Sequence, residues 1–193
     1  MSSLRERIEA LQQDLVVTPM RISAYHDLPF AIFRYDPEDE HLARKEAVLL
    51  ARRLENAGRQ VHFFSLARAL WEAVRRTEGL DAIVEAEREW GFERTQRTVS
   101  TLLSDPDFLP LAAQLEAWTK GFDPAVDVVF LVRAAALAPG IYRCARLLDE
   151  MHHRTMVPMI LFYPGTIEGT TALRFMALPD REPGAYNYRV RIY

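Results

Sequence analysis

Pro29-Phe-Ala-Ile-Phe-Arg-Tyr35 runs directly into Asp36-Pro37-Glu38-Asp39-Glu40. The first stretch is a mostly apolar run of strand length, which is typical of a strand buried on both faces of a sheet. The second has the composition of a helix start, because Pro suits the first helical position and carboxylates favour the positive end of the helix dipole. A buried strand followed by a helix is the unit of an α/β fold, so this stretch predicts a parallel sheet covered by helices.

The same alternation of apolar strand and amphipathic helix continues toward the C-terminus. Gly58 is placed to end the helix that starts at Asp36, and Ser65 is placed to cap the helix after the second strand. Residues 80–120 are helical by pattern, with breaks near Gly91 and at 104–106, and form a large insertion between the second and third strands. The remaining predicted elements are strands at Gln60–Ser65, Ala125–Val132 and Val157–Tyr163, and a helix opened by Pro139-Gly140.

Two further strands are predicted at Ala172–Leu178 and at Tyr188–Tyr193, where apolar and Arg residues alternate. Short turns join them, so we expect both to be antiparallel additions at one edge of the sheet. Residues 1–17 form a predicted helix that starts with a capping box at Ser3 and Glu6. The predicted fold class is therefore α/β: a three-layer sandwich with a mainly parallel central sheet, in a single domain over residues 1–193.

The amino-acid composition indicates which broad class of protein the chain belongs to. Of the 193 residues, 49% are hydrophobic and 26% are charged, as in an average soluble globular domain. No apolar run approaches the ~18 residues of a membrane span, and the N-terminus does not resemble a secretory signal, so we expect a cytoplasmic protein without membrane contact. The single cysteine, Cys144, fits a reducing compartment. A net charge of −3 leaves few cations for DNA phosphates, so no direct specific nucleic-acid binding is expected.

Ligands of open α/β sheets gather at the carboxyl ends of the strands. Here these ends carry two Arg residues and the loop Gly165-Thr-Ile-Glu-Gly-Thr-Thr171, so an anion site is one interpretation of this rim. A structural role is the other, in which Arg133, directly after a buried strand, pairs with an acid, Asp36 first of all. The candidate rim residues are Arg34, Asp36, Arg133, Gly165, Thr166, Gly169 and Thr170.

The Gly/Thr loop lacks the parts of a nucleotide phosphate loop. It has no Lys, its glycine spacing differs, and a strand rather than a helix follows it. A tight turn between two strands, with Gly165 and Gly169 in unusual backbone conformations, is the favoured interpretation. We therefore expect no hydrolysis of ATP or GTP.

No set of residues has the spacing of a catalytic or metal site. The five histidines include no i, i+4 pair of the kind that binds zinc on a helix, and Cys144 has no second thiol. Neither Ser65 nor Cys144 lies in a nucleophile elbow. Helix capping explains the carboxylates at 36–40 better than Mg²⁺ binding does. The sequence therefore predicts no catalytic residues, no metal site and no cofactor.

Two segments have the composition of protein-binding surfaces, which are enriched in aromatic and Arg side chains. In the helical insertion, Trp90, Phe92 and Phe108 exceed what one helix face needs for packing. The C-terminal strand is the second segment, although Arg on an edge strand also prevents unwanted pairing. Its candidate contact residues are Tyr188, Arg189 and Arg191.

Several strings of residues resemble one known family. They are Pro29-Phe-Ala-Ile-Phe-Arg-Tyr-Asp-Pro-Glu-Asp-Glu40, Val128-Val-Phe-Leu-Val-Arg-Ala134, Val157-Pro-Met-Ile-Leu-Phe-Tyr-Pro-Gly-Thr-Ile-Glu-Gly-Thr-Thr171 and Leu173-Arg-Phe-Met-Ala177. From about Asp27 to the C-terminus the chain resembles the BrxB family, small proteins encoded in bacterial bacteriophage-exclusion (BREX) clusters. The string at 162–171 is the most specific part of the resemblance, and the insertion is the least specific.

The resemblance implies a part in defence against phage, alongside a DNA methyltransferase, an AAA+ ATPase and the alkaline-phosphatase-like protein PglZ. It also implies an accessory protein that associates with PglZ, because the family has no established enzymatic activity and no agreed catalytic residues. We therefore expect a non-catalytic adaptor that binds the PglZ-like component and other BREX proteins. The alternative is an enzyme or a nucleotide or anion sensor at the strand-end rim, and a DNA-binding role for the C-terminus is the third hypothesis.

Overall fold

The computed structural model describes residues 3–22, 28–168, 172–178, 186–187 and 190–193. Its central sheet has the strand order β2-β3-β4-β1-β7, and each neighbouring pair in that order is parallel. The predicted parallel sheet is therefore confirmed. Its strands are β1 (Phe30–Tyr35), β2 (Gln60–Ser65), β3 (Asp127–Val132), β4 (Met159–Glu168) and β7 (Arg191–Ile192).

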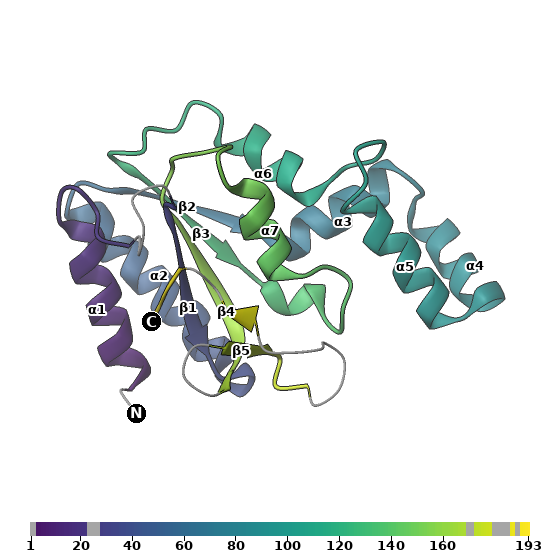
Figure 1. Ribbon diagram of the computed structural model, residues 1–193, viewed down its shortest axis with the longest axis horizontal. Coiled ribbons are helices and arrows are strands. Elements are labelled where there is room, and N and C mark those ends of the chain that lie inside the picture. Colours follow the sequence, from purple (N-terminus) through teal and green to yellow (C-terminus); the bar gives the residue numbers. More distant parts are fainter. Residues whose placement is uncertain (1–2, 23–27, 169–171, 179–185, 188–189) are drawn as a thin grey trace.

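Helices cover both faces of this sheet (Figure 1). Successive residues of a strand point to opposite faces, so Phe33 of β1 belongs to one apolar core and Ile32 to the other. This arrangement confirms the predicted three-layer sandwich. The first face is covered by α1 (Leu4–Val16) and α2 (Glu40–Asn56), and the second by α3 (Leu66–Arg76), α5 (Phe92–Leu102), α6 (Leu111–Thr119) and α7 (Cys144–Met151).

Local signals predicted two helix starts correctly and one wrongly. Ser3 and Glu6 form the expected capping box, and the Ser65 hydroxyl accepts a hydrogen bond from the first turn of α3. The helix predicted to open at Pro139-Gly140 begins instead at Cys144. Residues 138–140 form a turn instead, and the Ile141 carbonyl that follows accepts a hydrogen bond from the Ser100 hydroxyl of α5, so a tertiary contact holds this segment.

Arg59, at the start of β2, fastens the C-terminal end of α1 to the sheet. Its side chain is buried and donates to the carbonyl oxygens of Leu15, Val16, Val17 and Ala125. The last carbonyls of a helix have no partner within the helix, and the helix dipole favours a cation beside them. The Arg59 side chain therefore provides hydrogen-bond donors for the carbonyls at the end of α1 and for the Ala125 carbonyl just before β3.

The strand β4 continues past the parallel sheet and pairs with β5 (Ala172–Phe175), which pairs with β6 (Tyr186–Asn187), both in antiparallel fashion. The predicted unusual backbone conformation of Gly165 is wrong, because 165–168 are strand residues with Gly165 outside the left-handed region. A Cβ at Gly165 would lie 2.2 Å from the Arg174 carbonyl oxygen, so close approach of two chains explains the glycine. Gly169 and Thr170 lie outside the described residues.

The last strand runs in a different direction from its prediction. We expected an antiparallel strand, but β7 pairs with β1 in parallel. The Tyr193 N–H donates to the Ile32 carbonyl at 2.9 Å, and the Arg34 N–H donates to the Tyr193 carbonyl at 3.0 Å. Without β7, β1 would be an edge strand with open donors and acceptors, so the parallel pairing satisfies that edge. The predicted strand at Ala172–Leu178 is β5, and its antiparallel direction is confirmed, although it pairs with the inner strand β4 rather than with an edge strand.

Residues 80–120 are helical, as predicted, and their first part projects from the sandwich. The helices α4 (Leu80–Trp90) and α5 form a hairpin that extends away from the sheet (Figure 1). No residue of α4 is buried, whereas Val99 and Leu102 of α5 enter the core on the α7 side. Within the described residues, no helix is both long enough and apolar enough to cross a membrane.

Candidate functional site

Three of the predicted rim residues meet at the carboxyl end of β1. The Arg34 guanidinium forms an ion pair with Asp36, with 2.5 Å between Nη1 and Oδ1. The same nitrogen donates to the carbonyl oxygen of Gly165 at 3.3 Å, which joins this point to β4. Arg34 is buried and Asp36 is half-buried, so the Asp36 carboxylate neutralises the charge of the buried guanidinium. The expected cap from Asp36 to the short helix η1 (Pro37–Asp39) is wrong, because Arg34 binds its carboxylate instead.

Arg7 of α1 lies at the same rim, and sequence reasoning missed it. Its guanidinium donates to the backbone carbonyls of Arg34 and Tyr193 and lies 5.4 Å from the centre of the Phe33 ring. Burial lowers the pKa of Arg7, and the neighbouring Arg34 cation lowers it further. The Nε atoms of both arginines are buried without a hydrogen-bond partner among the described residues. The contact depends on how α1 packs on the sheet, which the residues around Arg7 do not reveal.

Arg133 follows β3, which β4 separates from β1, and its predicted ion pair with Asp36 is wrong. Arg133 has φ 62° and ψ 39°, a left-handed conformation that turns the chain sharply into η2 (Ala134–Leu137). Its side chain is exposed, and no ion pair of its guanidinium occurs in the part of the chain that the structure describes. Thr166 is half-buried on β4, beyond the Arg34 contact.

The acids that follow β1 serve local structure. Glu40 accepts a hydrogen bond from the Tyr35 hydroxyl through one oxygen and binds Arg44 Nε through the other at 2.6 Å. Burial raises the pKa of Tyr35 far above its usual value, and the hydrogen bond to Glu40 raises it further, so the phenol stays a donor. Over the described ranges, no group of three or more His, Cys, Asp and Glu side chains could hold a metal ion.

The α4–α5 hairpin presents large apolar side chains to solvent. Trp90 is 45% exposed and Phe92 is 49% exposed, on either side of the turn at Gly91. The guanidinium of Arg94 lies 4.6 Å from the Trp90 ring and leaves much of the ring uncovered. Exposed apolar side chains on a projecting element are characteristic of an interaction site. Two more exposed apolar residues of α4 are Leu80 and Val84, and the predicted Phe108 is exposed in the segment between α5 and α6.

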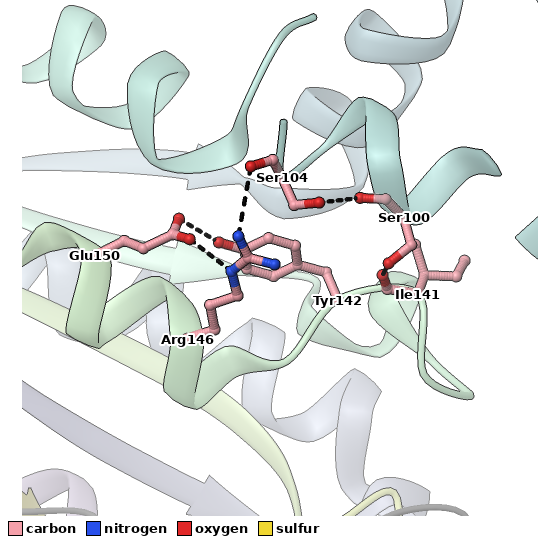
Figure 2. A network of polar contacts seen from close by, with 6 residues as sticks. All are labelled: Ser100, Ser104, Ile141, Tyr142, Arg146 and Glu150. Carbon is pink, nitrogen blue, oxygen red and sulfur yellow. Dashed lines mark hydrogen bonds and ion pairs between the residues drawn. The ribbon is translucent and has the colours of Figure 1, made fainter. Parts of the chain in front are cut away.

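Polar contacts fix the C-terminal end of α5 to α7 and the segment before it (Figure 2). The Ser100 hydroxyl donates to the Ile141 carbonyl at 2.6 Å. Glu150 accepts from the Tyr142 hydroxyl at 2.7 Å and from Arg146 Nε at 2.5 Å. Tyr142 is buried, and burial raises the pKa of its hydroxyl. The hairpin is therefore held at its base, which lowers the entropy cost of using its tip as a binding surface.

The C-terminal strand holds α1 to the sheet. Arg191 binds the Asp14 carboxylate at 2.9 Å and donates to the Arg21 carbonyl at 3.0 Å. The Tyr193 hydroxyl donates to the same carboxylate at 2.8 Å. Arg191, predicted as a partner contact, thus has an internal role in the described structure. The other two predicted contact residues, Tyr188 and Arg189, lie outside the described residues.

The fold and these surfaces define an α/β sandwich with a projecting helical hairpin, a class whose functions depend on the surfaces that each member carries. The family model for BREX protein BrxB matches residues 62–192. The chain belongs to the BrxB family, and it is accordingly a BREX protein, part of a phage defence system. A curated relative, BREX protein BrxB of Bacillus cereus (strain H3081.97), is 27% identical over 160 residues, which cover 80% of each chain. No solved structure matches the chain.

Proposed function

We propose that this protein is a non-catalytic accessory component of BREX defence, which works in the cytoplasm and binds the PglZ-like component through the α4–α5 hairpin. The observation that carries the proposal is the hairpin itself, with an outer helix that has no buried residue. Trp90 and Phe92 at its turn are aromatic, rigid and about half exposed, which suits anchors of an interface. Other BREX proteins are the natural candidates for the partner, because the chain belongs to a BREX family.

The geometry at the strand-end rim supports a structural role more than the alternative of an anion sensor. Asp36 already neutralises Arg34, and the main-chain oxygen of Gly165 occupies a further donor position. Arg133, the second cation that such a sensor required, is exposed and follows β3, which β4 separates from β1. An incoming anion would therefore have to displace the Asp36 carboxylate from Arg34, and the neighbouring Arg7 already donates to main-chain carbonyls, which disfavours binding.

Co-expression with the PglZ-like protein of the same gene cluster, followed by size-exclusion chromatography, tests the proposal. We expect the two proteins to co-elute at micromolar concentration. The double variant Trp90→Ala with Phe92→Ala should weaken the complex by roughly 2–4 kcal/mol, since buried aromatic anchors contribute on this scale. The matched control is Leu42→Ala with Val48→Ala, which removes side chains of α2 that are 45% and 51% exposed.

The control variant should leave the complex intact, and both variants should keep the circular dichroism spectrum of the parent chain. Phage plaque counts on cells with the complete gene cluster then connect binding to defence. Protection should be lost with the Trp90 and Phe92 variant and kept with the α2 variant. Separate elution of the two parent proteins would contradict the proposal outright, and equal affinity of the two variants would exclude the hairpin as the contact.

A further inference from the structure

The strand β2 forms one edge of the central sheet and, among the described strands, pairs with β3 alone. The Gln60 N–H donates to the Val126 carbonyl at 3.0 Å, so Gln60 and every second residue after it face β3. The N–H and C=O groups of Val61 and Phe63 therefore point away from the sheet, and neither residue has another backbone partner in the described ranges. Lys, Pro or a covering element usually protects such an edge, but β2 contains neither Lys nor Pro.

A groove of about 600 Å³ opens beside this edge, between α3 and α6. Phe63 and Phe64 both line it, although neighbours on a strand point to opposite faces. The groove therefore extends from the face that α3 and α6 cover to the edge of the sheet. Leu109 and Trp118 form its apolar wall. The charged residues along it are Arg68, Glu72 and Arg76.

We propose that β2 binds an extended segment of a partner protein, which adds to the sheet as a further strand and places an apolar side chain in this groove. Outward N–H and C=O groups of an edge strand are complementary to extended backbone, and a neighbouring pocket selects the side chain. Phe63, 40% exposed, offers a cross-strand contact to an aromatic or β-branched residue. Glu72 binds Arg76 at 3.7 Å, but Arg68 has no ion pair among the described residues. The partner segment should therefore also carry a carboxylate that pairs with Arg68.

A second copy of the chain fits this surface less well than a lone segment does. The side chains of β2 that face the groove side are His62 and Phe64. In each molecule, the Phe122 ring lies 4.3 Å from His62 and the Trp118 ring lies 5.3 Å from Phe64. A copied β2 therefore brings no free side chain to fill the groove. The surface includes no residue of the α4–α5 hairpin, so the proposal stands independently of the proposed hairpin contact.

Overlapping 15-residue peptides that cover the other proteins of the same BREX gene cluster are a suitable probe. Their binding to the full chain is measured in solution by fluorescence anisotropy. We expect at least one peptide with alternating apolar residues and an acid to bind at micromolar concentration. Hydrogen exchange followed by NMR should then show new protection at the amides of Val61 and Phe63, while Gln60, His62 and Phe64 are protected already without peptide.

Two variants of Phe63 separate backbone pairing from side-chain contact. Phe63→Ala removes the ring and keeps the outward N–H, whereas Phe63→Pro also removes that N–H without touching the ladder to β3. Phe63→Pro should bind the peptide roughly tenfold more weakly than Phe63→Ala, the effect of one lost hydrogen bond. Should Phe63→Pro not fold, Ala113→Trp fills the groove with the backbone intact and should weaken binding to a similar extent.

Four results would overturn the proposal. They are the absence of any binding peptide, equal affinity of the two folded Phe63 variants, no effect of Ala113→Trp, and bound peptide without new protection at Val61 and Phe63. Protection of those two amides that rises with the concentration of the chain alone, together with dimer formation in light scattering, would assign the edge to a second copy instead.

Discussion

A Cβ at position 165 would lie 2.2 Å from the carbonyl oxygen of Arg174 and 2.6 Å from Cε1 of Tyr163. Gly165→Ala therefore forces β4 and β5 apart and should lower the free energy of unfolding by about 1–3 kcal/mol, as overpacking does elsewhere. Urea unfolding followed by circular dichroism measures the change. Gly140→Ala is the control, because its nearest neighbour, Nε2 of Gln96, lies at an ordinary 3.6 Å. Equal stability of the two variants would contradict this account of Gly165.

Arg59 gives the second prediction at the scale of single residues. Arg59→Met keeps the apolar length of the side chain but leaves the carbonyls of Leu15, Val16 and Val17 without their donor. The free energy of unfolding should fall by roughly 2–4 kcal/mol, the cost of several buried polar groups without partners. Arg52→Met, which removes an exposed pair with Glu55, should change it by less than about 0.5 kcal/mol. A loss of similar size in both variants would refute the role given to Arg59.

Sequence reasoning placed Arg34 and Asp36 at one rim correctly, because both belong to the end of a single strand. It placed Arg133 there too, because the carboxyl ends of parallel strands share an edge. Arg133 instead has a left-handed backbone conformation that redirects the chain, and an Arg in the sequence does not indicate that conformation. It missed Arg7 because the packing angle of α1 on the sheet decides which part of the helix reaches the rim. Residues of one element are thus predictable as a group, whereas contacts between elements depend on docking.

At the scale of elements, the base of the hairpin can be loosened without changing its tip. Ser100→Ala removes the 2.6 Å hydrogen bond from α5 to the Ile141 carbonyl and leaves that oxygen unsatisfied. Amides of α4 and α5 should then exchange with solvent about tenfold faster, with those of β3 unchanged. Thr98→Ala on the same helix removes only a local contact to the Arg94 carbonyl and is the control. Hydrogen exchange followed by mass spectrometry measures the exchange rates in both variants. Equal rates in Ser100→Ala and Thr98→Ala would contradict the role of the Ser100 hydrogen bond in holding the hairpin.

The existence and order of the major elements were predictable because apolar periodicity alone separates buried strands from amphipathic helices. The ends of the elements and the pairing of the strands were less predictable. β4 was expected to stop at Tyr163, but it continues to Glu168 because β5 supplies partners for its later residues. The direction of β7 was set by the open edge of β1, which no local signal near Arg191 reveals. Tertiary pairing, rather than propensity, decides both features.

For the whole molecule, three buried tyrosines predict a loss of stability in alkali. Burial raises the pKa of each hydroxyl, and a hydrogen bond to a carboxylate raises it further. The unfolded chain releases these protons near the ordinary value of about 10, so stability is complete below that pH and falls as pH rises toward the folded pKa. The pairs are Tyr35 with Glu40, Tyr142 with Glu150 and Tyr193 with Asp14.

Urea unfolding between about pH 8 and 11 measures this loss, which should approach about 1.4 kcal/mol per pH unit for each tyrosine above pH 10. Tyr142→Phe should reduce the slope of stability against pH by the contribution of one tyrosine, whatever its effect on stability at neutral pH. A slope that the substitution leaves unchanged would show that the hydroxyl of Tyr142 titrates alike in the folded and unfolded chain.

The projecting hairpin also has an evolutionary consequence. The outer helix, α4, has no buried residue and only its partly buried Ile83 packs against a core, so a gain or loss of whole helical turns beyond Ile83 leaves the register of every strand untouched. A single-residue insertion in β4 would instead turn its side chains to the wrong faces in both sheets that it borders. Diverging members of a lineage can therefore alter the length and chemistry of the hairpin and inherit the sheet unchanged.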